Sequence, residues 1–238
     1  MKNSMEMFSP GEISFYVTRA AIGVGVPFGI AEDFANSLIW SQPMGIDLAQ
    51  LALDSLNALD SNPGSGRISI FQKGLNQIFT GRSGLSAVFA GPSLSDFWKI
   101  STDKDCTLMG KAVDFPILVA GAFVKAESRP ALLEWENVRF TLYENGSIDL
   151  MVTDDMALKK AGPFDVLIRK PENETGTIEA LHFNTNNLDQ MAQKALNRGI
   201  YINKEAWSGI LSLFKRSLIP SSNQSLNTGA GAGLVDND

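Results

Sequence analysis

The chain has 238 residues, of which 44% are hydrophobic and 19% are charged. This composition is typical of a globular protein with a sizeable core, and it excludes wholesale disorder and collagen-like structure. The formal net charge is -6 and there is no run of basic residues, which argues against nucleic acid as a partner. A single cysteine, Cys106, and a single histidine, His182, cannot form an internal disulfide or a common zinc site.

The sequence lacks the signals of export and of membrane insertion. Its first residues contain no apolar segment of the kind that a secretory signal needs, so we expect a cytoplasmic protein. The longest apolar run, residues 115–124, is shorter than the roughly 20 residues of a membrane-spanning helix. It contains Pro116 and is bracketed by charged residues, which favours a buried strand. We therefore expect no membrane partner.

The N-terminal part of the chain, up to the glycine-rich segment that follows Asp60, predicts three helices and no strand. Ser9, Pro10 and Glu12 form a capping box with proline at the first helical position, so a helix is expected to begin there. Apolar residues then recur at helical spacing until Gly23, Gly25 and Pro27 end the helix. The same spacing returns at residues 31–39 and 48–59, which predicts two further helices.

Residues 61–66 are small or turn-forming and include no large apolar side chain, which predicts a linker. Residues 67–80 are ambiguous. The apolar segments 86–90 and 115–124 predict buried strands, with a short helix at residues 96–100 between them.

From residue 138 onward the apolar period becomes two. The alternation on both sides of Asn145 and Gly146 predicts a hairpin with a type I′ turn at these two residues. Further strands are expected at residues 165–169 and 177–183. Because these strands follow one another mostly without helices between them, the pattern favours an α+β fold over a doubly wound α/β fold.

Two helices are expected after the strands. Asn187 and Asn203 are predicted as their N-caps, with Gly199 ending the first helix and Pro220 ending the second. The predicted organisation is an N-terminal helical unit (1–60) packed on a mixed, largely antiparallel sheet in an α+β body (67–220). A Gly/Ala-rich tail (221–238) follows, and all three parts are expected to form one compact domain.

No complete cofactor motif is present. The spacing Gly23-x-Gly25-x-x-x-Gly29 follows a helix, whereas a dinucleotide fingerprint follows a strand, and it is one residue too long. We find no nucleotide, haem or zinc motif, so the cofactor is unknown. Asp154 and Asp155 have the chemistry to bind Mg²⁺ or Ca²⁺, but a solvated turn explains them better, and no metal site is predicted.

Four residues of the body are candidates for chemistry. His182 has the only side chain whose ordinary pKa lies near neutrality, which makes it the candidate general base, although a structural histidine on a sheet is the simpler interpretation. Asp96 is a second catalytic candidate. Arg139 and Arg169 are candidates for binding an anionic ligand.

The C-terminal segment GAGAGLVDND is the least ordinary part of the sequence. Alternating glycine and alanine allow the backbone to lie flat against another surface, and Asp236 and Asp238 bring negative charge to it. We expect this segment to be ordered in a groove of the same chain or of a second copy. Its candidate residues are Asp236 and Asp238 for catalysis, and Gly229, Gly231, Gly233 and Asn237 for binding. The alternative is a disordered tail.

The C-terminal segment is also similar to the C-terminus of a known protein family. The chain resembles an uncharacterised bacterial family, catalogued only as a domain of unknown function, whose members end in GAGAGL, one variable residue and then DND. Residues 19–33, 90–93 and 116–118 also resemble that family, as do Asp96 and Trp135. The resemblance implies no activity and no site residue, because none is established for the family.

Two functions remain open from the sequence. One is a small-molecule enzyme, favoured slightly, whose site gathers the tail carboxylates with Asp96, Arg139, Arg169 or His182. The other is a non-catalytic accessory or assembly protein whose tail docks on a partner or on a second copy, as in a homo-oligomer. A tail that lines a concave pocket beside a titratable group would favour the enzyme.

Overall fold

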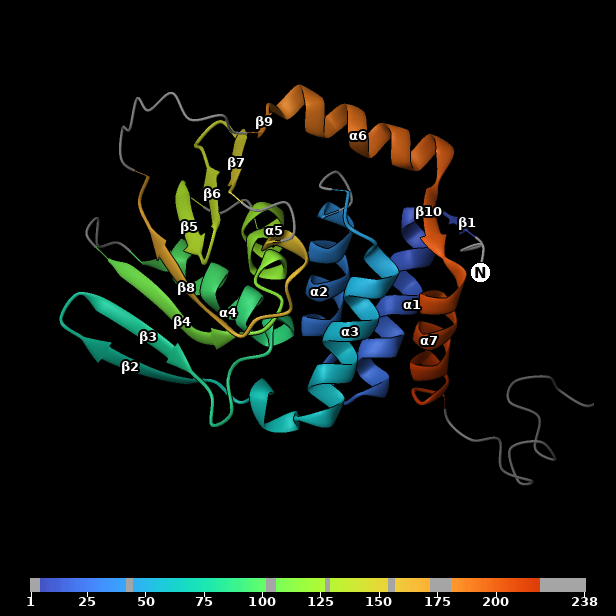
Figure 1. Ribbon diagram of the computed structural model, residues 1–238, viewed down its shortest axis with the longest axis horizontal. Coiled ribbons are helices and arrows are strands. Elements are labelled where there is room, and N and C mark those ends of the chain that lie inside the picture. The colour runs from blue at the N-terminus through green and yellow to red at the C-terminus, as the bar shows by residue number, and fades with distance from the viewer. Residues whose placement is uncertain are drawn as a thin grey trace, which may run out of the picture.

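The computed structural model describes residues 5–41, 45–101, 106–126, 129–153, 157–171 and 181–218. Within these residues helices gather on one side of the molecule and a sheet on the other (Figure 1). The helices are α1 (Pro10–Gly23), α2 (Phe28–Trp40), α3 (Leu48–Ser61), α4 (Ala87–Ile100), α5 (Ile117–Lys125), α6 (Thr185–Arg198) and α7 (Lys204–Lys215). Helices α4 and α5 lie between the sheet and the remaining helices, and α6 bridges the two sides (Figure 1).

The main sheet has eight strands among the described residues, in the order β2-β3-β4-β8-β5-β6-β7-β9. Their bounds are β2 (Ser69–Lys73), β3 (Asn76–Thr80), β4 (Thr107–Val113), β5 (Ala131–Trp135), β6 (Val138–Leu142), β7 (Ile148–Val152), β8 (Phe164–Arg169) and β9 (Leu181–Phe183). Only β3 and β4 pair in parallel; every other described pair is antiparallel. The expected α+β fold with a mixed, largely antiparallel sheet is confirmed.

A strand near the N-terminus contradicts the prediction that this part of the chain holds helices alone. β1 (Met5–Phe8) pairs antiparallel with β10 (Ile200–Asn203), and together they form a separate two-stranded sheet. The partner strand lies near the opposite end of the sequence, so no local pattern indicates it. Ser9 follows directly, and its side chain and that of Glu12 form the expected capping box at the start of α1.

The two apolar segments that predicted buried strands are helical instead. Residues 87–90 and 96–100 belong to the continuous helix α4, and residues 117–124 belong to α5. Seven of the nine residues of α5 are buried, so the helix has no polar face. An apolar run without a polar face does not distinguish a buried helix from a buried strand, which is why the prediction was wrong.

The hairpin lies where it was predicted, but its turn is of another kind. The N–H of Gly146 donates to the carbonyl of Tyr143 (3.0 Å), and the N–H of Tyr143 donates to the carbonyl of Ser147 (3.0 Å). Gly146 has φ +76°, whereas Asn145 is not among the residues with positive φ. A type I′ turn needs positive φ at both central residues, so that part of the prediction is wrong.

The remaining local predictions differ in detail. The ambiguous residues 67–80 form the β2–β3 hairpin, and the predicted linker contains a 3₁₀ turn, Pro63–Gly66. The prediction that Asn187 caps the next helix is wrong: Asn184 is the N-cap of α6, and Asn187, three residues further on, is its capping-box partner. Gly199 ends α6 and Asn203 caps α7, as predicted. No described helix is long and apolar enough to cross a membrane.

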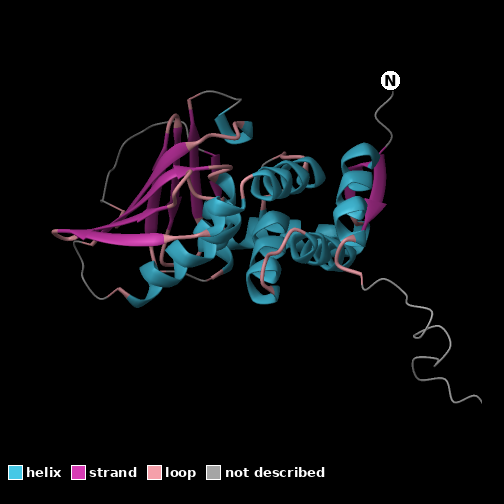
Figure 2. Cartoon of the chain, turned by 90° about the horizontal axis from the view of Figure 1, so that it is seen from below, coloured by secondary structure: helices cyan, strands magenta, loops and turns pink. Residues whose placement is uncertain are grey.

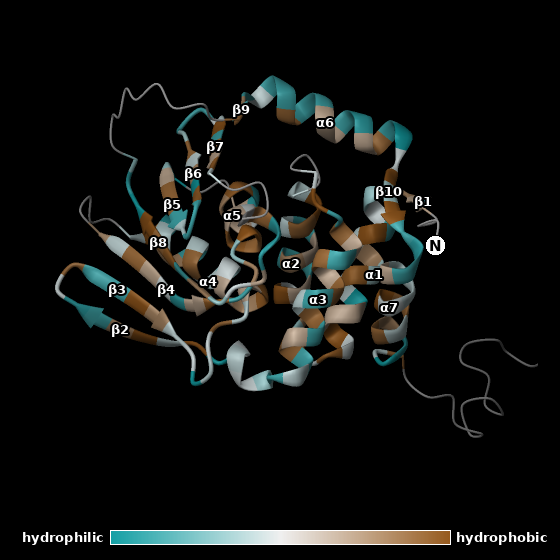
Figure 3. Ribbon diagram, viewed as in Figure 1, coloured by the Kyte–Doolittle hydropathy of each residue, from teal (hydrophilic) through white to brown (hydrophobic). Residues whose placement is uncertain are grey.

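One continuous core joins the helices to the inner face of the sheet. Its largest fully buried side chains include Phe34, Trp98, Phe123 and Phe140. Hydrophobic residues concentrate where α4 and α5 lie against the sheet and where α2 packs on these two helices (Figure 3), and Figure 2 shows helices gathered on one side of the sheet. The opposite, outer face of the sheet is therefore free to carry polar side chains.

Candidate functional site

Polar and charged side chains gather on the outer face of the sheet. In β6 the residues Val138, Phe140 and Leu142 are buried in the core, while Arg139 and Thr141 alternate with them and face outward. Directly opposite residues of an antiparallel pair point to the same face. The register sets Arg139 opposite Glu134 of β5, Thr141 opposite Asp149 of β7, and Asp149 opposite His182 of β9. Sheet pairing thus brings these side chains onto one face.

A chain of hydrogen bonds links three of the outer-face residues. His182 Nδ1 contacts Asp149 Oδ1, and the hydroxyl of Tyr143 donates to Asp149 Oδ2 at 2.5 Å. Both carboxylate oxygens of Asp149 are therefore engaged. The His182 side chain is 56% exposed while that of Asp149 is 29% exposed, so the ring opens to the surface from a more buried partner. We call Tyr143, Asp149 and His182 the histidine cluster.

The ionisation of Tyr143 depends on this contact. The hydrogen bond to the Asp149 carboxylate, followed by burial, raises the pKa of Tyr143 to about 12, and the positive charge of Arg139 opposes the rise. Tyr143 consequently stays protonated at neutral pH and keeps donating to Asp149. The influence of Arg139 also shows that its charge lies near the histidine cluster.

A second polar group adjoins the cluster on the same face. Glu134 accepts from Arg169 Nε at 3.2 Å, and Arg139 Nε lies 3.4 Å from the other oxygen of Glu134. All three side chains are between 24% and 32% exposed. The two arginines that the sequence singled out are thus held beside one carboxylate on neighbouring strands.

Hollows flank the histidine cluster. One, of about 440 Å³, is lined by all three members of the cluster and by Glu144, Asn145 and Ser147. The other, of about 370 Å³, continues past His182 along α6 and is lined also by Phe183, Asn187, Gln190, Met191 and Lys194. The exposed ring of His182 borders both, so a small molecule in either hollow can reach it.

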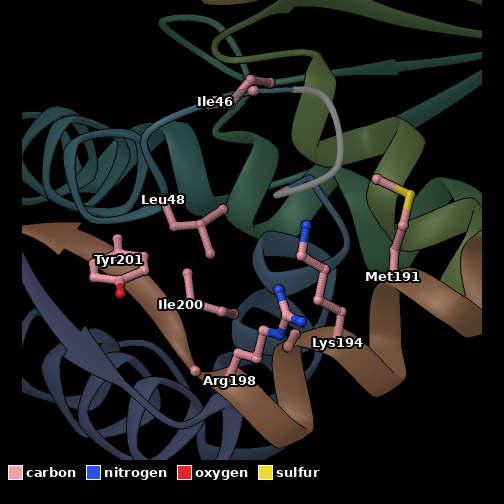
Figure 4. Close-up of a pocket in the computed structure, with 10 residues that line it drawn as sticks. Ile46, Leu48, Met191, Lys194, Arg198, Ile200 and Tyr201 are labelled. Carbon is pink, nitrogen blue, oxygen red and sulfur yellow. The ribbon is translucent and has the colours of Figure 1, made fainter.

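A third hollow, of about 470 Å³, lies beneath the far end of α6 and shares Met191 and Lys194 with the second. Figure 4 shows Lys194 and Arg198 extending from α6 toward the space that Leu48 and Ile200 border. The hollows therefore follow α6 from the sheet to the helical side of the molecule.

The structure brings three of the predicted site residues to one face of the sheet, namely Arg139, Arg169 and His182. Asp96 is not among them. It is exposed on α4, near Asp33 of α2, where burial and then the charges of Asp96 and Glu32 raise the pKa of Asp33.

The predictions for the tail lie outside the described residues. This applies to Gly229, Gly231, Gly233, Asp236, Asn237 and Asp238. It applies equally to Asp154 and Asp155.

Sequence reasoning missed Asp149 and Tyr143. Asp149 is an outward-facing residue of the alternating strand β7, and nothing in that pattern says which side chain lies opposite it. The register of β9 supplies this information. Asp149 could have been found as a carboxylate at an outward-facing position of β7, the strand that pairs with the strand of His182.

Asp114 is a further titratable group that the sequence did not reveal. It accepts a hydrogen bond from the N–H of Ala87 at 2.6 Å, at the start of α4, where the N-cap residue Ser86 makes no side-chain cap. Burial raises the pKa of Asp114 to about 7, against the lowering effect of that hydrogen bond. Asp114 therefore caps a helix and lines none of the three hollows.

We tested whether the described residues suit a metal or a dinucleotide. Among them, no group of three or more His, Cys, Asp or Glu side chains could hold a metal ion. The turn Gly81–Gly84 leads from β3 into α4, the arrangement in which a pyrophosphate would dock at the helix N-terminus. The carboxylate of Asp114 already occupies that N-terminus, so a pyrophosphate does not fit there.

The comparisons with known proteins bear on the fold. The sequence matches no protein-family model and none of the curated proteins searched. The malate dehydrogenase from Pyrococcus horikoshii is similar in structure, with a TM-score of 0.61 and 9% identity over 93% of this chain and 98% of that chain. The malate dehydrogenase from Entamoeba histolytica gives a TM-score of 0.59 and 7% identity over 92% and 99%.

The sulfolactate dehydrogenase from Methanocaldococcus jannaschii gives a TM-score of 0.56 and 10% identity over 89% of this chain and 97% of that chain. At such low identity the likeness concerns the fold alone, because one fold supports many functions. The chain has the fold that these dehydrogenase structures have.

Proposed function

We propose that this chain is an enzyme that acts on a small molecule bearing a hydroxyl or carbonyl group, with His182 as its proton donor and acceptor. The observation that carries the proposal is the histidine cluster at the rim of two hollows. An exposed imidazole held by a more buried carboxylate, which is itself held by a tyrosine hydroxyl, is the arrangement that general acid–base catalysis uses.

The cluster defines a role for each member. Because the Asp149 carboxylate only accepts, the Nδ1–H of His182 donates to it, and the other ring nitrogen, Nε2, is left to face a ligand. In the neutral ring Nε2 accepts a proton from a substrate hydroxyl; in the charged ring it returns a proton to a carbonyl oxygen. Tyr143 fixes the second oxygen of Asp149 and so orients the pair.

The substrate class follows from two considerations. Malate and sulfolactate, which the names of the similar structures mention, are both 2-hydroxy acids. Oxidation of such a compound removes a hydroxyl proton, which His182 Nε2 accepts, and transfers a hydride from the same carbon to a soluble acceptor such as NAD⁺ or NADP⁺. No residue is assigned to hold that acceptor, because the β3–α4 turn does not suit a dinucleotide. No role is assigned to the tail residues, which lie outside the described residues.

The test measures turnover of a panel of 2-hydroxy acids, including malate and sulfolactate, and of 2-oxo acids. Each hydroxy acid is assayed with and without NAD⁺ or NADP⁺, and each oxo acid with and without NADH or NADPH. For the compound turned over, His182→Gln should lower kcat at least 100-fold, the usual contribution of a positioned acid–base group. Asp149→Asn should lower it less, and Tyr143→Phe least. Lys111→Gln, a change at an exposed ion pair on another strand, serves as the control. Equal turnover by wild type and His182→Gln would contradict the proposal.

A second candidate, the accessory or assembly protein, is favoured by one observation. Met5 and Met7 of β1 and Tyr201 of β10 are 50%, 55% and 68% exposed, and Met7 lies opposite Tyr201 in the register. Exposed apolar side chains grouped on one small sheet are typical of contact surfaces. If this sheet joins two copies, Tyr201→Glu should lower the mass measured by light scattering and leave any turnover unchanged.

A further inference from the structure

We infer that the hollow beneath the C-terminal half of α6 is a separate binding site for an organic anion, in which Lys194 and Arg198 hold a phosphate or carboxylate group and the apolar wall holds the rest of the molecule. This site goes beyond the proposed function, since His182 does not line it.

The size and lining of the hollow suit such a compound. Its volume of about 470 Å³ lies within the roughly 300 to 1,000 Å³ typical of small-molecule sites. Leu48 and Ile200 are buried and form the floor, while Ile46 and Ala195 are partly buried. Leu48 and Ile200 border the space into which Lys194 and Arg198 extend from α6 (Figure 4), so the site has both apolar and charged sides.

The two cations make no ion pair with any described carboxylate. Lys194 and Arg198 are four residues apart on α6, so they lie on the same side of the helix and repel each other. A bound dianion would neutralise both, and the guanidinium of Arg198 would hold two of its oxygens at once.

Helix α6 packs only lightly on the rest of the molecule. None of its 14 residues is buried, and Leu188 and Ala195 pack against the core as partly buried residues. Its ends are held by a capping box at Asn184 and by Gly199 at φ +74°. The apolar part of a ligand in the hollow would contact Met191 and Ala195 and so stabilise α6.

A purely structural role for the two cations makes a different prediction. Basic residues near a helix C-terminus interact favourably with the helix dipole, and Arg198 lies in the last turn of α6. Lys215 occupies the same place in α7. A dipole role would therefore make Arg198→Gln and Lys215→Gln alike in their effect on melting temperature, and it would give neither an effect on ligand affinity.

The experiment is calorimetric titration of the full chain with phenyl phosphate, inorganic phosphate, benzoate and benzyl alcohol. Phenyl phosphate should bind at least 10-fold more tightly than inorganic phosphate, and benzyl alcohol should not bind. The relative affinity for benzoate distinguishes a carboxylate site from a phosphate site. Lys194→Gln and Arg198→Gln should each weaken phenyl phosphate binding at least 5-fold, and the double variant should abolish it. Ala195→Leu should weaken it by filling the hollow without altering charge.

Matched controls accompany the titration. Lys215→Gln and His182→Gln should bind phenyl phosphate as the wild type does, and circular dichroism should give every variant the wild-type helix content. Two outcomes would overturn the inference: undetectable binding to wild type at millimolar concentration, or undiminished binding to the double variant.

Discussion

Helices α5 and α6 differ in how much of their surface is buried against the rest of the molecule. Seven of the nine residues of α5 are buried, and Gly121 approaches α2 so closely that an added Cβ would lie 2.5 Å from the carbonyl oxygen of Ser37. Helix α6 has no buried residue in 14. The α2–α5 contact is therefore part of the tightly packed core, while α6 leaves most of its surface exposed.

The largest effect is expected from closing the α2–α5 gap. Gly121→Val forces atoms into the space taken by the Ser37 backbone, and overpacking of this kind costs about 1 to 3 kcal/mol or more. Urea unfolding should show a loss of at least that size. Gly29→Ala in α2, where an added Cβ meets nothing within 4 Å, is the control and should be neutral or slightly stabilising. A Gly121→Val protein as stable as wild type would refute the close contact.

Asp114 is expected to make the free energy of unfolding depend on pH. Because burial raises its pKa in the folded protein to about 7, the stability that protonated Asp114 contributes is present below its ordinary value of 3.8 and is lost as pH rises through about 7. Each unit of pKa difference corresponds to about 1.4 kcal/mol. Asp114→Asn should therefore lose the decline in unfolding free energy between pH 4 and pH 7. If the free energy of unfolding of Asp114→Asn declines between pH 4 and pH 7 as it does in wild type, Asp114 is not the cause of the decline.

Gly146 lies in the turn between β6 and β7, next to the start of α6. With φ +76° and an added Cβ placed 3.2 Å from Thr185 Cγ2, Gly146→Val should cost about 1 to 2 kcal/mol. The neighbouring change Glu144→Ala should stay within about 0.5 kcal/mol. Thermal unfolding of both proteins measures the difference, and equal melting temperatures would mean that the turn tolerates a side chain.

The smallest effect is expected on α6. Leu196 is 61% exposed, so Leu196→Lys removes almost no buried apolar surface and should change the free energy of unfolding by less than about 0.5 kcal/mol. A loss above about 1 kcal/mol in chemical denaturation, well outside the range of ordinary surface changes, would show that the exposed side of α6 at Leu196 is packed. The contrast with α5 would then fail.

The same contrast explains what the sequence could predict. Ser9, Gly199 and Asn203 were identified correctly because caps and stops act within a few residues. Helix α5 was mistaken for a strand because complete burial removes the periodicity that distinguishes the two. β1 was missed because its pairing partner, β10, is remote in the sequence.

For the candidate site, residue type could indicate His182 but not its surroundings. His182 stood out as the only histidine, and Arg139 and Arg169 as strand cations. Asp149 and Tyr143 could not be joined to it, because only the β6–β7–β9 register sets them side by side. The cation pair on α6 was missed for a similar reason, since the hollow that it faces is formed by α6 together with segments far from it in the sequence, around Leu48.

The central claim, that Asp149 holds His182 with Nε2 turned to a ligand, is tested most directly by long-range ¹H–¹⁵N NMR of the imidazole. The chain has one histidine, so its ring signals need no assignment. The neutral ring of the wild type should be protonated at Nδ1, and Asp149→Asn should shift the population toward Nε2–H. Adding the 2-hydroxy and 2-oxo acids should then move the Nε2 signal of the wild type. A ring protonated at Nε2 in the wild type, or one that no compound perturbs, would contradict the account.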